Sequence, residues 1–327
     1  MTNFWQSRNG RILVVLLAAG GYLICLALTR PAPAYRTETN IPYCVVDGQT
    51  ETLNAFLPAN TNRPAPALVE IHGGWWMGGK AAAVPPRQMV SKGIAFFSIE
   101  YRLGQTGGFP QNIRDCRNAI RFLRKNAARF NIDPDRIDVM GGSAGGHLSL
   151  MVAMVPEDFD DGGPTPGLEG VSAKVSGSFS FIPPTDFLSF WEQGPSDVIT
   201  NANGSFSFRA PAPNIPNDSR PHFRLLFHGV IPDTAAHREL YQRMCPLGQV
   251  RKDVPPLLIC DGEKDPIVPG LEGKALYEKL HAAGADVTYW MTRNGGHTYP
   301  GGAGFQDVLG AFLVRTLKPE PPETDKP

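Results

Sequence analysis

Ser143 lies at the centre of a Gly-x-Ser-x-Gly pattern that runs from Gly141 to Gly145, where an apolar stretch of the chain ends. A chain that reverses sharply from a strand into a helix strains the residue at the apex, and its neighbours must be small because a Cβ there would collide with the turn. The strain exposes the serine hydroxyl, while the following helix offers unpaired N–H groups and its positive dipole end to an anion. The pattern predicts a serine nucleophile; the alternative interpretation is an ordinary glycine-rich turn.

The flanking segments provide the setting that such a nucleophile needs. Residues 136–140 are typical of a short buried strand, and residues 144–155 contain no proline and are typical of a helix. The resulting strand–turn–helix arrangement favours the nucleophile over the plain turn.

A serine hydroxyl is a poor nucleophile until a base removes its proton, and the base must be oriented by a third group. His297 lies in a glycine-rich loop after the predicted strand 287–291, and Asp265 lies just past the predicted strand 256–260. In a parallel sheet, these loops and the loop of Ser143 all emerge at the carboxyl edge. We therefore predict His297 as the base and Asp265 as the acid that orients it.

Asp261 is the rival carboxylate in the same loop. It directly follows the predicted strand, so we expect its side chain to support the loop. Asp265 comes four residues later, past a turn at Gly262, where the chain has cleared the sheet edge. Its carboxylate can therefore point toward the histidine loop.

The tetrahedral intermediate of acyl transfer also needs donors for its oxyanion. The N–H of Ala144, just after the nucleophile, can supply one. The N–H groups of Gly73 and Gly74 can supply others, because glycine lets the chain approach closely. His72, directly before them, is interpreted as a residue that fixes this loop.

Two tryptophans follow the paired glycines. Trp75 and Trp76 could stack on a sugar or on an aromatic acyl group, or could form the wall and core beside the loop. They are candidates for the substrate pocket.

Other polar residues are given structural interpretations. Arg102 and Asp115 are predicted to form an ion pair that supports the fold. His147 follows Ser143 by about one helical turn and is expected to pack or to hydrogen-bond locally.

Strand-like and helix-like segments alternate along most of the chain. Residues 42–57 are typical of a hairpin that turns at Asp47-Gly48, and residues 35–40 before it are typical of a linker. Further strands are predicted at 67–71, 93–100, 175–182, 256–260 and 287–291, and helices at 109–130, 271–283 and 305–317. The alternation predicts an α/β fold, with a mostly parallel sheet and helices on both faces.

Residues 183–227 interrupt this alternation. The segment is rich in Pro, Asn, Ser and Gly, and it carries five aromatic residues within the 22 residues from Phe187 to Phe208. Aromatics at that density favour packing over disorder, so we predict a lid-like insert. Residues 318–327, mostly proline and charge, are typical of a flexible tail.

The N-terminus has a membrane-targeting pattern. Arg8 and Arg11 precede an uncharged stretch of 17 residues, Ile12 to Leu28, and Ala32-Pro33-Ala34 offers a cleavage site before the next residue. Residues 1–34 are therefore predicted to be a signal peptide or an uncleaved membrane anchor. The protein is expected to be exported, or held at a membrane through this segment alone.

Composition supports one globular domain over residues 35–317. The 327-residue chain is 42% apolar with a net charge of zero, and no basic stripe is present that would bind nucleic acid. Export would allow disulfides, but Cys116 and Cys260 lie in segments where a free cysteine is usually buried. No Cys or His spacing indicates a metal site.

A set of segments together indicates a family. They are His72-Gly73-Gly74 with Trp76, Glu100-Tyr101-Arg102-Leu103, Phe109-Pro110, Asp115-Cys116, Ile132-Asp133-Pro134, Gly141 to His147, Asp265-Pro266 and His297. With this combination, over about residues 41–317, the chain resembles the α/β-hydrolase esterases of the hormone-sensitive-lipase and feruloyl/acetyl-esterase-like groups. It departs from them at Trp75, where many members have a third glycine, and at Asp261, where a histidine is often found.

The resemblance implies the α/β-hydrolase fold and an ester hydrolase that needs no cofactor. Ser143, His297 and Asp265 would be its catalytic triad, in the chain order Ser, Asp, His of that fold. The oxyanion would bind to the N–H groups assigned above. The expected substrate is a small or carbohydrate-linked ester, cleaved through an acyl-enzyme.

Two alternative functions remain at this point. A serine peptidase or amidase of the prolyl-oligopeptidase type shares the elbow pattern, although the His72-Gly73-Gly74 loop and the lack of a propeller-length N-terminal domain weigh against it. A catalytically silent binding protein with the same fold is disfavoured because all three triad candidates are present.

Overall fold

A sheet of eight strands carries the residues singled out above. The computed structural model describes residues 6–7, 10–11, 35–59, 63–159, 163–188, 191, 197–200, 206–209, 226–268 and 272–319. The strands of the sheet are β3 (Tyr35–Val46), β4 (Gln49–Pro58), β5 (Ala65–Ile71), β6 (Ala95–Ile99), β7 (Ile132–Gly142), β8 (Gly177–Phe181), β11 (Leu257–Gly262) and β12 (Val287–Thr292).

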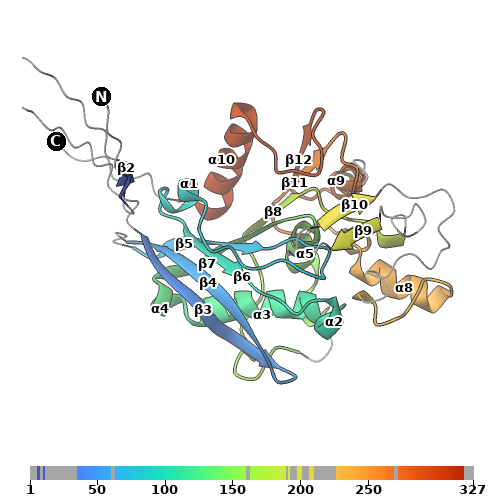
Figure 1. The fold of residues 1–327 in the computed structure, drawn as a ribbon, viewed down its shortest axis with the longest axis horizontal. Coiled ribbons are helices and arrows are strands. Elements are labelled where there is room, and N and C mark those ends of the chain that lie inside the picture. The colour runs from blue at the N-terminus through green and yellow to red at the C-terminus, as the bar shows by residue number, and fades with distance from the viewer. Residues whose placement is uncertain are drawn as a thin grey trace, which may run out of the picture.

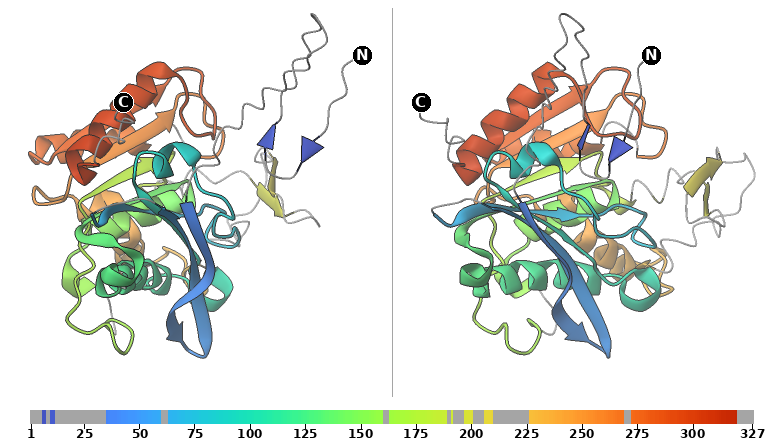
Figure 2. Two further views of the ribbon diagram at one scale, coloured as in Figure 1. Left: turned by 90° about the vertical axis from the view of Figure 1, so that its left-hand side faces the viewer. Right: turned by 60° about the vertical axis from the view of Figure 1, so that its left-hand side comes forward.

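The order of the strands is β12-β11-β8-β7-β5-β6-β4-β3. The hairpin β3–β4 and the pair β4–β6 are antiparallel, and the pairs from β6 to β12 are parallel. The hairpin turns at Asp47 and Gly48, as predicted, and extends along one side of the molecule (Figure 2). Because β5, β7, β11 and β12 run in the same direction, the loops that follow them emerge at one edge of the sheet.

Helices cover both faces of the sheet, as the alternation of segments predicts. On one face, α1 (Arg87–Val90) and α10 (Ala303–Leu317) pack on an apolar cluster that includes Phe96 and Phe179. On the other face lie α3 (Gln111–Lys125), α4 (Ala127–Phe130), α5 (Ala144–Met154) and α9 (Glu272–Ala282). Figure 1 shows α1 and α10 on one side and α3 and α4 on the other. The predicted α/β-hydrolase architecture is confirmed.

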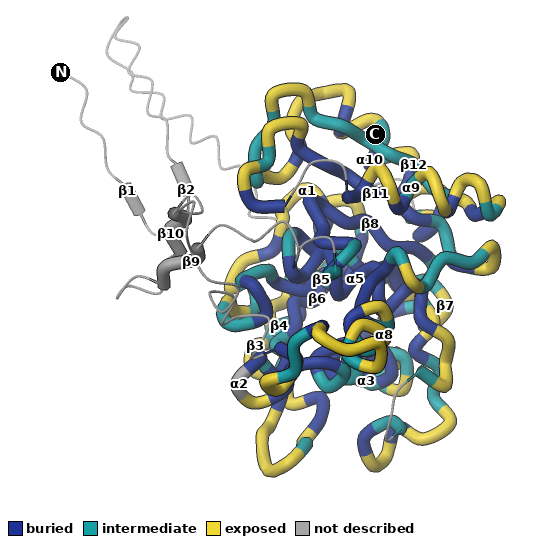
Figure 3. Tube along the Cα trace, turned by 90° about the vertical axis from the view of Figure 1, so that its right-hand side faces the viewer, coloured by how far each residue is buried: buried dark blue, intermediate teal, exposed yellow. Residues whose placement is uncertain are grey.

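The interior strands and α5 form the centre of the core. Strand β6 is buried along its whole length, and so is every residue of α5, which lies against the sheet (Figure 3). Apolar residues on all sides of α5 allow this burial. The helix that follows Ser143 is therefore fixed from every side.

Two of the boundaries predicted from sequence are wrong. Residues 35–40 are not a linker: they begin β3 and pair with the end of β4, from Tyr35↔Pro58 to Glu38↔Ala55. An edge strand exposes one side to water, so its polar residues made it look like linker. The helix predicted over 109–130 ends at Lys125, and Asn126 separates it from α4.

Helix α8 (Ala235–Met244) was not predicted from the sequence. Thr234 caps it by accepting a hydrogen bond from the His237 N–H, and this capping signal was present in the sequence. The short helices are α2 (Gly104–Gly107), η1 (Glu157–Phe159) and η2 (Pro246–Gln249).

Most of the expected lid, residues 183–227, lies outside the described residues. Within it, β9 (Asp197–Thr200) and β10 (Phe206–Arg209) pair as a separate antiparallel sheet. Near the N-terminus, β1 (Gln6–Ser7) and β2 (Gly10–Arg11) form another short pair.

The expected signal or anchor stretch, residues 12–28, also lies outside the described residues, as does the tail from residue 320. Among the helices that the structure describes, none has the length and apolarity needed to cross a bilayer. Cys44, Cys116, Cys245 and Cys260 are all buried free thiols, which agrees with the interpretation of Cys116 and Cys260 as buried hydrophobes.

Candidate active site

Ser143 sits at a strained elbow between β7 and α5. Its φ of 57° and ψ of −123° lie where residues with a Cβ are rarely found, and such a conformation costs on the order of 1–3 kcal/mol. A Cβ on Gly141 would collide with the Gly145 backbone, and one on Gly145 would collide with the Ile71 carbonyl. The predicted strand–turn–helix is present, and its small neighbours are needed for the predicted reason.

His297 and Asp265 meet at the same sheet edge. His297 Nδ1 lies 2.8 Å from Asp265 Oδ2, and the Asp265 side chain is only 1% exposed. The other carboxylate oxygen, Oδ1, accepts hydrogen bonds from the N–H groups of Ile267 (2.8 Å) and Val268 (3.0 Å). The carboxylate is therefore fixed by its own loop. It favours the tautomer with the proton on Nδ1, which leaves Nε2 as an acceptor.

The histidine loop also contacts the elbow. Gly262, at the end of β11, packs against the carbonyls of Gly295 and Gly296, and the Tyr299 hydroxyl lies beside Gly142. The structure shows no hydrogen bond of Ser143 Oγ or of His297 Nε2 to any described residue. Such contacts are often long without substrate and shorten in the complex.

The three N–H groups predicted to bind the oxyanion are unpaired. Those of Gly73, Gly74 and Ala144 donate to no group among the residues that the structure describes. By contrast, the Ser143 N–H donates to the Phe181 carbonyl at 2.9 Å. A Cβ on Gly73 would lie 2.8 Å from the Gly142 carbonyl oxygen and 3.5 Å from Ser143 Cβ, so this loop runs directly against the nucleophile. Gly73 therefore lies against Ser143, and the role of Gly73, Gly74 and Ala144 as oxyanion donors stays a prediction.

The loop that carries Gly73 and Gly74 is anchored at both ends. The His72 ring stacks on Tyr101 at 4.4 Å between centroids, and the Tyr101 hydroxyl donates to the His72 carbonyl at 3.0 Å. His72 Nε2 also lies 3.4 Å from a Glu100 carboxylate oxygen, and the other oxygen accepts the Ala81 N–H at 3.0 Å. The interpretation of His72 as a loop-fixing residue is confirmed.

Trp75 and Trp76 form part of the wall behind this loop. Both have positive φ angles, 56° and 58°, in a region that bulky side chains rarely adopt. A glycine at the position of Trp75 would adopt this conformation without strain. Both indoles are buried, at 5% and 1% exposure, so they offer no open stacking platform in this conformation.

His147 holds Trp76 in place. The Trp76 indole N–H donates to His147 Nδ1 at 3.1 Å, and His147 Nε2 donates to the Met244 carbonyl at 2.8 Å. Burial lowers the pKa of His147 to about 3, so the imidazole is neutral, as these two bonds require. The expected local hydrogen bonding of His147 is confirmed.

Asp261 hydrogen-bonds to α9 and β12 and not to His297. Its Oδ2 accepts the Lys274 N–H (3.1 Å) at the start of α9 and the Tyr289 hydroxyl (3.0 Å) on β12. Burial raises the pKa of this carboxyl to about 7.

The predicted ion pair is present as well: Arg102 Nε lies 2.8 Å from Asp115 Oδ2. Asp261 and this pair therefore have structural roles.

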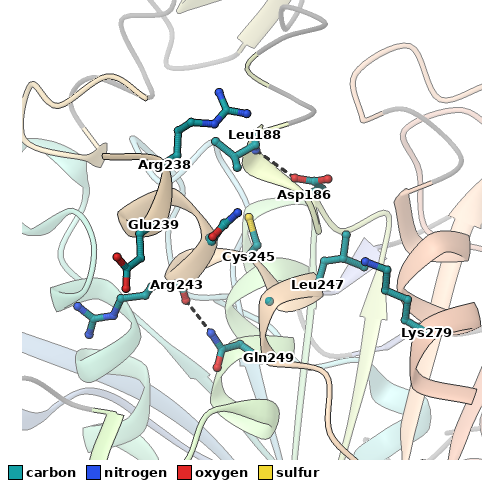
Figure 4. Close-up of a pocket in the computed structure, with 11 residues that line it drawn as sticks. Asp186, Leu188, Arg238, Glu239, Arg243, Cys245, Leu247, Gln249 and Lys279 are labelled. Atoms are coloured by element: carbon teal, nitrogen blue, oxygen red, sulfur yellow. Dashed lines mark hydrogen bonds between the residues drawn. The ribbon is translucent and has the colours of Figure 1, made fainter. Parts of the chain in front are cut away.

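A cavity of the described residues lies away from the three side chains of the predicted triad. It has a volume of about 570 Å³ and lies between α8, η2 and the start of the insert, with Arg238, Arg243 and Lys279 at its rim (Figure 4). None of Ser143, Asp265 and His297 lines it. The position of the Tyr299 hydroxyl beside Gly142 was not predicted from the sequence, although the aromatic residue two positions after the predicted base was a visible signal.

The sequence is similar to esterases of Mycobacterium tuberculosis. Esterase LipQ is 29% identical over 242 residues, which are 72% of this chain and 51% of LipQ. Carboxylesterase NlhH is 29% identical over 245 residues, which are 74% of this chain and 69% of NlhH. The chain thus spans about half the length of LipQ, and likewise 54% of esterase LipC.

Solved structures have the same fold. A truncated carbohydrate esterase from gut microbiota is 25% identical, with a TM-score of 0.68 over 87% of this chain and 98% of that one. The thermophilic esterase Est2 of Thermogutta terrifontis, 23% identical, has a TM-score of 0.62 over 86% of this chain and 92% of its own. The sequence also matches the BD-FAE family model over residues 53–280, which include Ser143 and Asp265. This protein belongs to the BD-FAE family and has the α/β-hydrolase fold.

Proposed function

We propose that this protein is a carboxylic-ester hydrolase with Ser143 as nucleophile, His297 as base and Asp265 as acid. One observation carries the proposal: a strained serine lies at the sheet edge where a buried carboxylate orients a histidine, and the N–H groups of Gly73, Gly74 and Ala144 in the loops of this edge are unpaired. These are the parts that acyl transfer through a serine requires.

The reaction follows from the roles of these groups. His297 Nε2 takes the proton of Ser143 as Oγ attacks the ester carbonyl, and Asp265 stabilises the imidazolium through Nδ1. The N–H groups of Gly73, Gly74 and Ala144 bind the oxyanion. His297 then protonates the leaving alcohol, and the acyl group remains on Oγ. A water molecule, deprotonated by His297, attacks the acyl-enzyme, and release of the acid restores the serine.

The relatives support esters over amides as substrates. The similar proteins LipQ and NlhH are described as an esterase and a carboxylesterase. We extend the proposal to small or carbohydrate-linked esters, because a structural neighbour at 25% identity is a carbohydrate esterase. A panel of acetylated sugars, feruloyl esters and short acyl esters tests this part, and activity confined to long-chain lipids would contradict it.

A labelling experiment tests the nucleophile. An organophosphonate probe should add one phosphonyl group to Ser143, and Ser143→Ala should abolish both the label and turnover of 4-nitrophenyl acetate. The expected loss in rate is on the order of 10⁴ to 10⁶. Ser91→Ala, at the exposed C-cap serine of α1 that donates to the Gln88 carbonyl, is the matched control and should keep both.

Two outcomes would contradict the proposal. If Ser143→Ala kept the label or a tenth of the rate, the nucleophile would be a different residue. If acetyl 4-nitroanilide were cleaved faster than the matching ester, an amidase would replace the esterase.

We also propose that residues 1–34 direct the protein to or across a membrane. The support is the basic flank followed by the uncharged stretch Ile12 to Leu28. Expression with and without these residues, followed by cell fractionation and N-terminal sequencing, distinguishes a cleaved signal from an anchor. If the form with residues 1–34 remained uncleaved and was recovered in the soluble cell contents, as the form without them is, the proposal would be refuted.

A further inference from the structure

Tyr299 reaches from the histidine loop to Gly142, the residue before Ser143. It lies two residues beyond His297, and a Cβ on Gly142 would lie 2.7 Å from its hydroxyl oxygen. Gly142 directly precedes Ser143. The phenol therefore occupies the space that any side chain at position 142 would need, next to the reacting serine.

Packing fixes the Tyr299 ring while leaving part of it accessible. The ring meets Phe181 edge to face, with centroids 4.8 Å apart at 72°. Phe181 is itself buried, and its carbonyl accepts the Ser143 N–H. Tyr299 is nevertheless 54% exposed. A side chain with one fixed side and one open side is suited to contact a bound molecule.

The Tyr299 hydroxyl has no hydrogen-bond partner among the residues that the structure describes. Burial of the hydroxyl end, and the negative charge of Glu70, raise the pKa of Tyr299 to about 12. The phenol therefore keeps its proton at neutral pH and can donate it to an acceptor that arrives with a ligand.

The chemistry of the reaction places the leaving alcohol on the same side. His297 must give a proton to the alcohol oxygen as the ester bond breaks, so this oxygen has to approach Nε2. A side chain two residues further along the same loop lies close to the group attached to that oxygen.

We propose that Tyr299 is a specificity residue that donates a hydrogen bond to the alcohol portion of the ester. It would favour alcohols that carry a further hydroxyl or ether oxygen over purely alkyl alcohols. The proposal rests on the ester hydrolase function proposed above and adds to it a residue and a preference on the alcohol side.

A pair of acetates tests this directly. 2-Hydroxyethyl acetate and propyl acetate share the acyl group and nearly the same size, and they differ in one terminal hydroxyl. Tyr299→Phe keeps the ring against Phe181 and removes only the donor. The ratio of kcat/KM for the two esters should fall by about 3- to 10-fold, the usual effect of one neutral hydrogen bond. Most of the change should lie in KM for the hydroxylated ester.

Two further variants separate this role from a general defect. Tyr277→Phe removes the same atom from a tyrosine of α9 that stacks on Tyr289, and it should leave the ratio unchanged. Gly142→Ala is compatible with the backbone, since Gly142 has no positive φ, but its methyl group displaces the Tyr299 hydroxyl. It should lower the ratio as Tyr299→Phe does, and combining the two should add little.

The outcomes distinguish the two proposals. If the wild-type protein hydrolyses both acetates and Tyr299→Phe leaves their ratio unchanged, the role of Tyr299 is refuted while the hydrolase stands. If the wild-type protein hydrolyses neither acetate and takes up no phosphonate, the proposed function falls, and the role of Tyr299 falls with it.

Discussion

The two carboxylates that follow β11 should respond in opposite ways to the same isosteric change. In Asp265→Asn, the amide oxygen should stay on the N–H groups of Ile267 and Val268, because these two donors fix its orientation. The amide NH₂ group then faces His297 Nδ1, where the carboxylate oxygen was at 2.8 Å. A donor at that position stabilises the tautomer with the proton on Nε2, which cannot accept the proton of Ser143.

The expected size of the effect follows from this exchange of tautomers. The fold should survive, because the two main-chain hydrogen bonds are kept. Activity at neutral pH should fall by roughly 10⁴, since both the correct tautomer and the charge that stabilises the imidazolium are lost. Phosphonate labelling of Ser143 should slow in parallel.

Asp261→Asn is the matched control. Its amide oxygen can still accept the Lys274 N–H and the Tyr289 hydroxyl, so most of the activity should remain. Because burial raises the pKa of Asp261 from about 3.8 to about 7, the folded state holds a proton that the unfolded chain has lost. The contribution of Asp261 to stability is therefore fully present below about pH 4 and is lost as the pH rises through 7.

The amide does not titrate in this range, so Asp261→Asn should gain stability relative to the wild type between pH 5 and pH 8. The gain is at most about 4 kcal/mol, because each pKa unit corresponds to about 1.4 kcal/mol.

The assay compares both variants with the wild type, side by side. Hydrolysis of 4-nitrophenyl acetate at pH 7.5 gives the rates, and urea unfolding at several pH values gives the free energies of unfolding. A reversed ranking, with Asp261→Asn inactive and Asp265→Asn active, would refute the assignment of the acid. A parallel pH dependence of stability in the wild type and Asp261→Asn would refute the raised pKa.

Three other substitutions test the surroundings of the site. His147→Ala should lower the free energy of unfolding by about 2–4 kcal/mol in urea titrations, because it leaves a cavity and an unpaired Trp76 N–H. A loss below about 1 kcal/mol would contradict this prediction. Arg102→Met should lower the free energy of unfolding by about 3–5 kcal/mol in the same measurement, because Asp115 would remain buried without its partner. An unchanged urea midpoint would show that the ion pair contributes nothing to stability. Gly74→Ala should lower kcat on the order of 10²- to 10³-fold with little change in KM. The reason is that the φ of 116° at Gly74 and the nearby Gly78 backbone leave no room for a Cβ. Normal kinetics would show that Gly74 does not bind the oxyanion.

Several elements could be predicted because their signals are local. The elbow at Ser143 needs glycines at fixed offsets, and the hairpin turn at Asp47-Gly48 needs a dipeptide that tolerates its geometry. The apolar strands 67–71 and 256–260 were found within two residues of their observed ends. In each case, the residues that cause the structure are neighbours along the chain.

Other features depend on partners that are distant in sequence. Residues 35–40 look polar and loop-like, and only their pairing with β4 makes them a strand. Trp75 and Trp76 have backbone angles that their own residue types disfavour, and contacts such as the bond of Trp76 to His147, 71 residues later, hold them there. No local pattern contains this information.

The division is clearest within the candidate site itself. The sequence by itself determined which residue types could act and at which edge of the sheet they would gather, because glycine patterns and strand ends are local properties. The choice of Asp265 over Asp261 was also made from the sequence, but only the tertiary structure identified Lys274 and Tyr289 as the partners that hold Asp261. Tertiary structure alone also brought Tyr299 beside Gly142, 157 residues earlier. The physical reason is that hydrogen bonds and steric exclusion act over a few ångströms in space, whatever the separation along the chain.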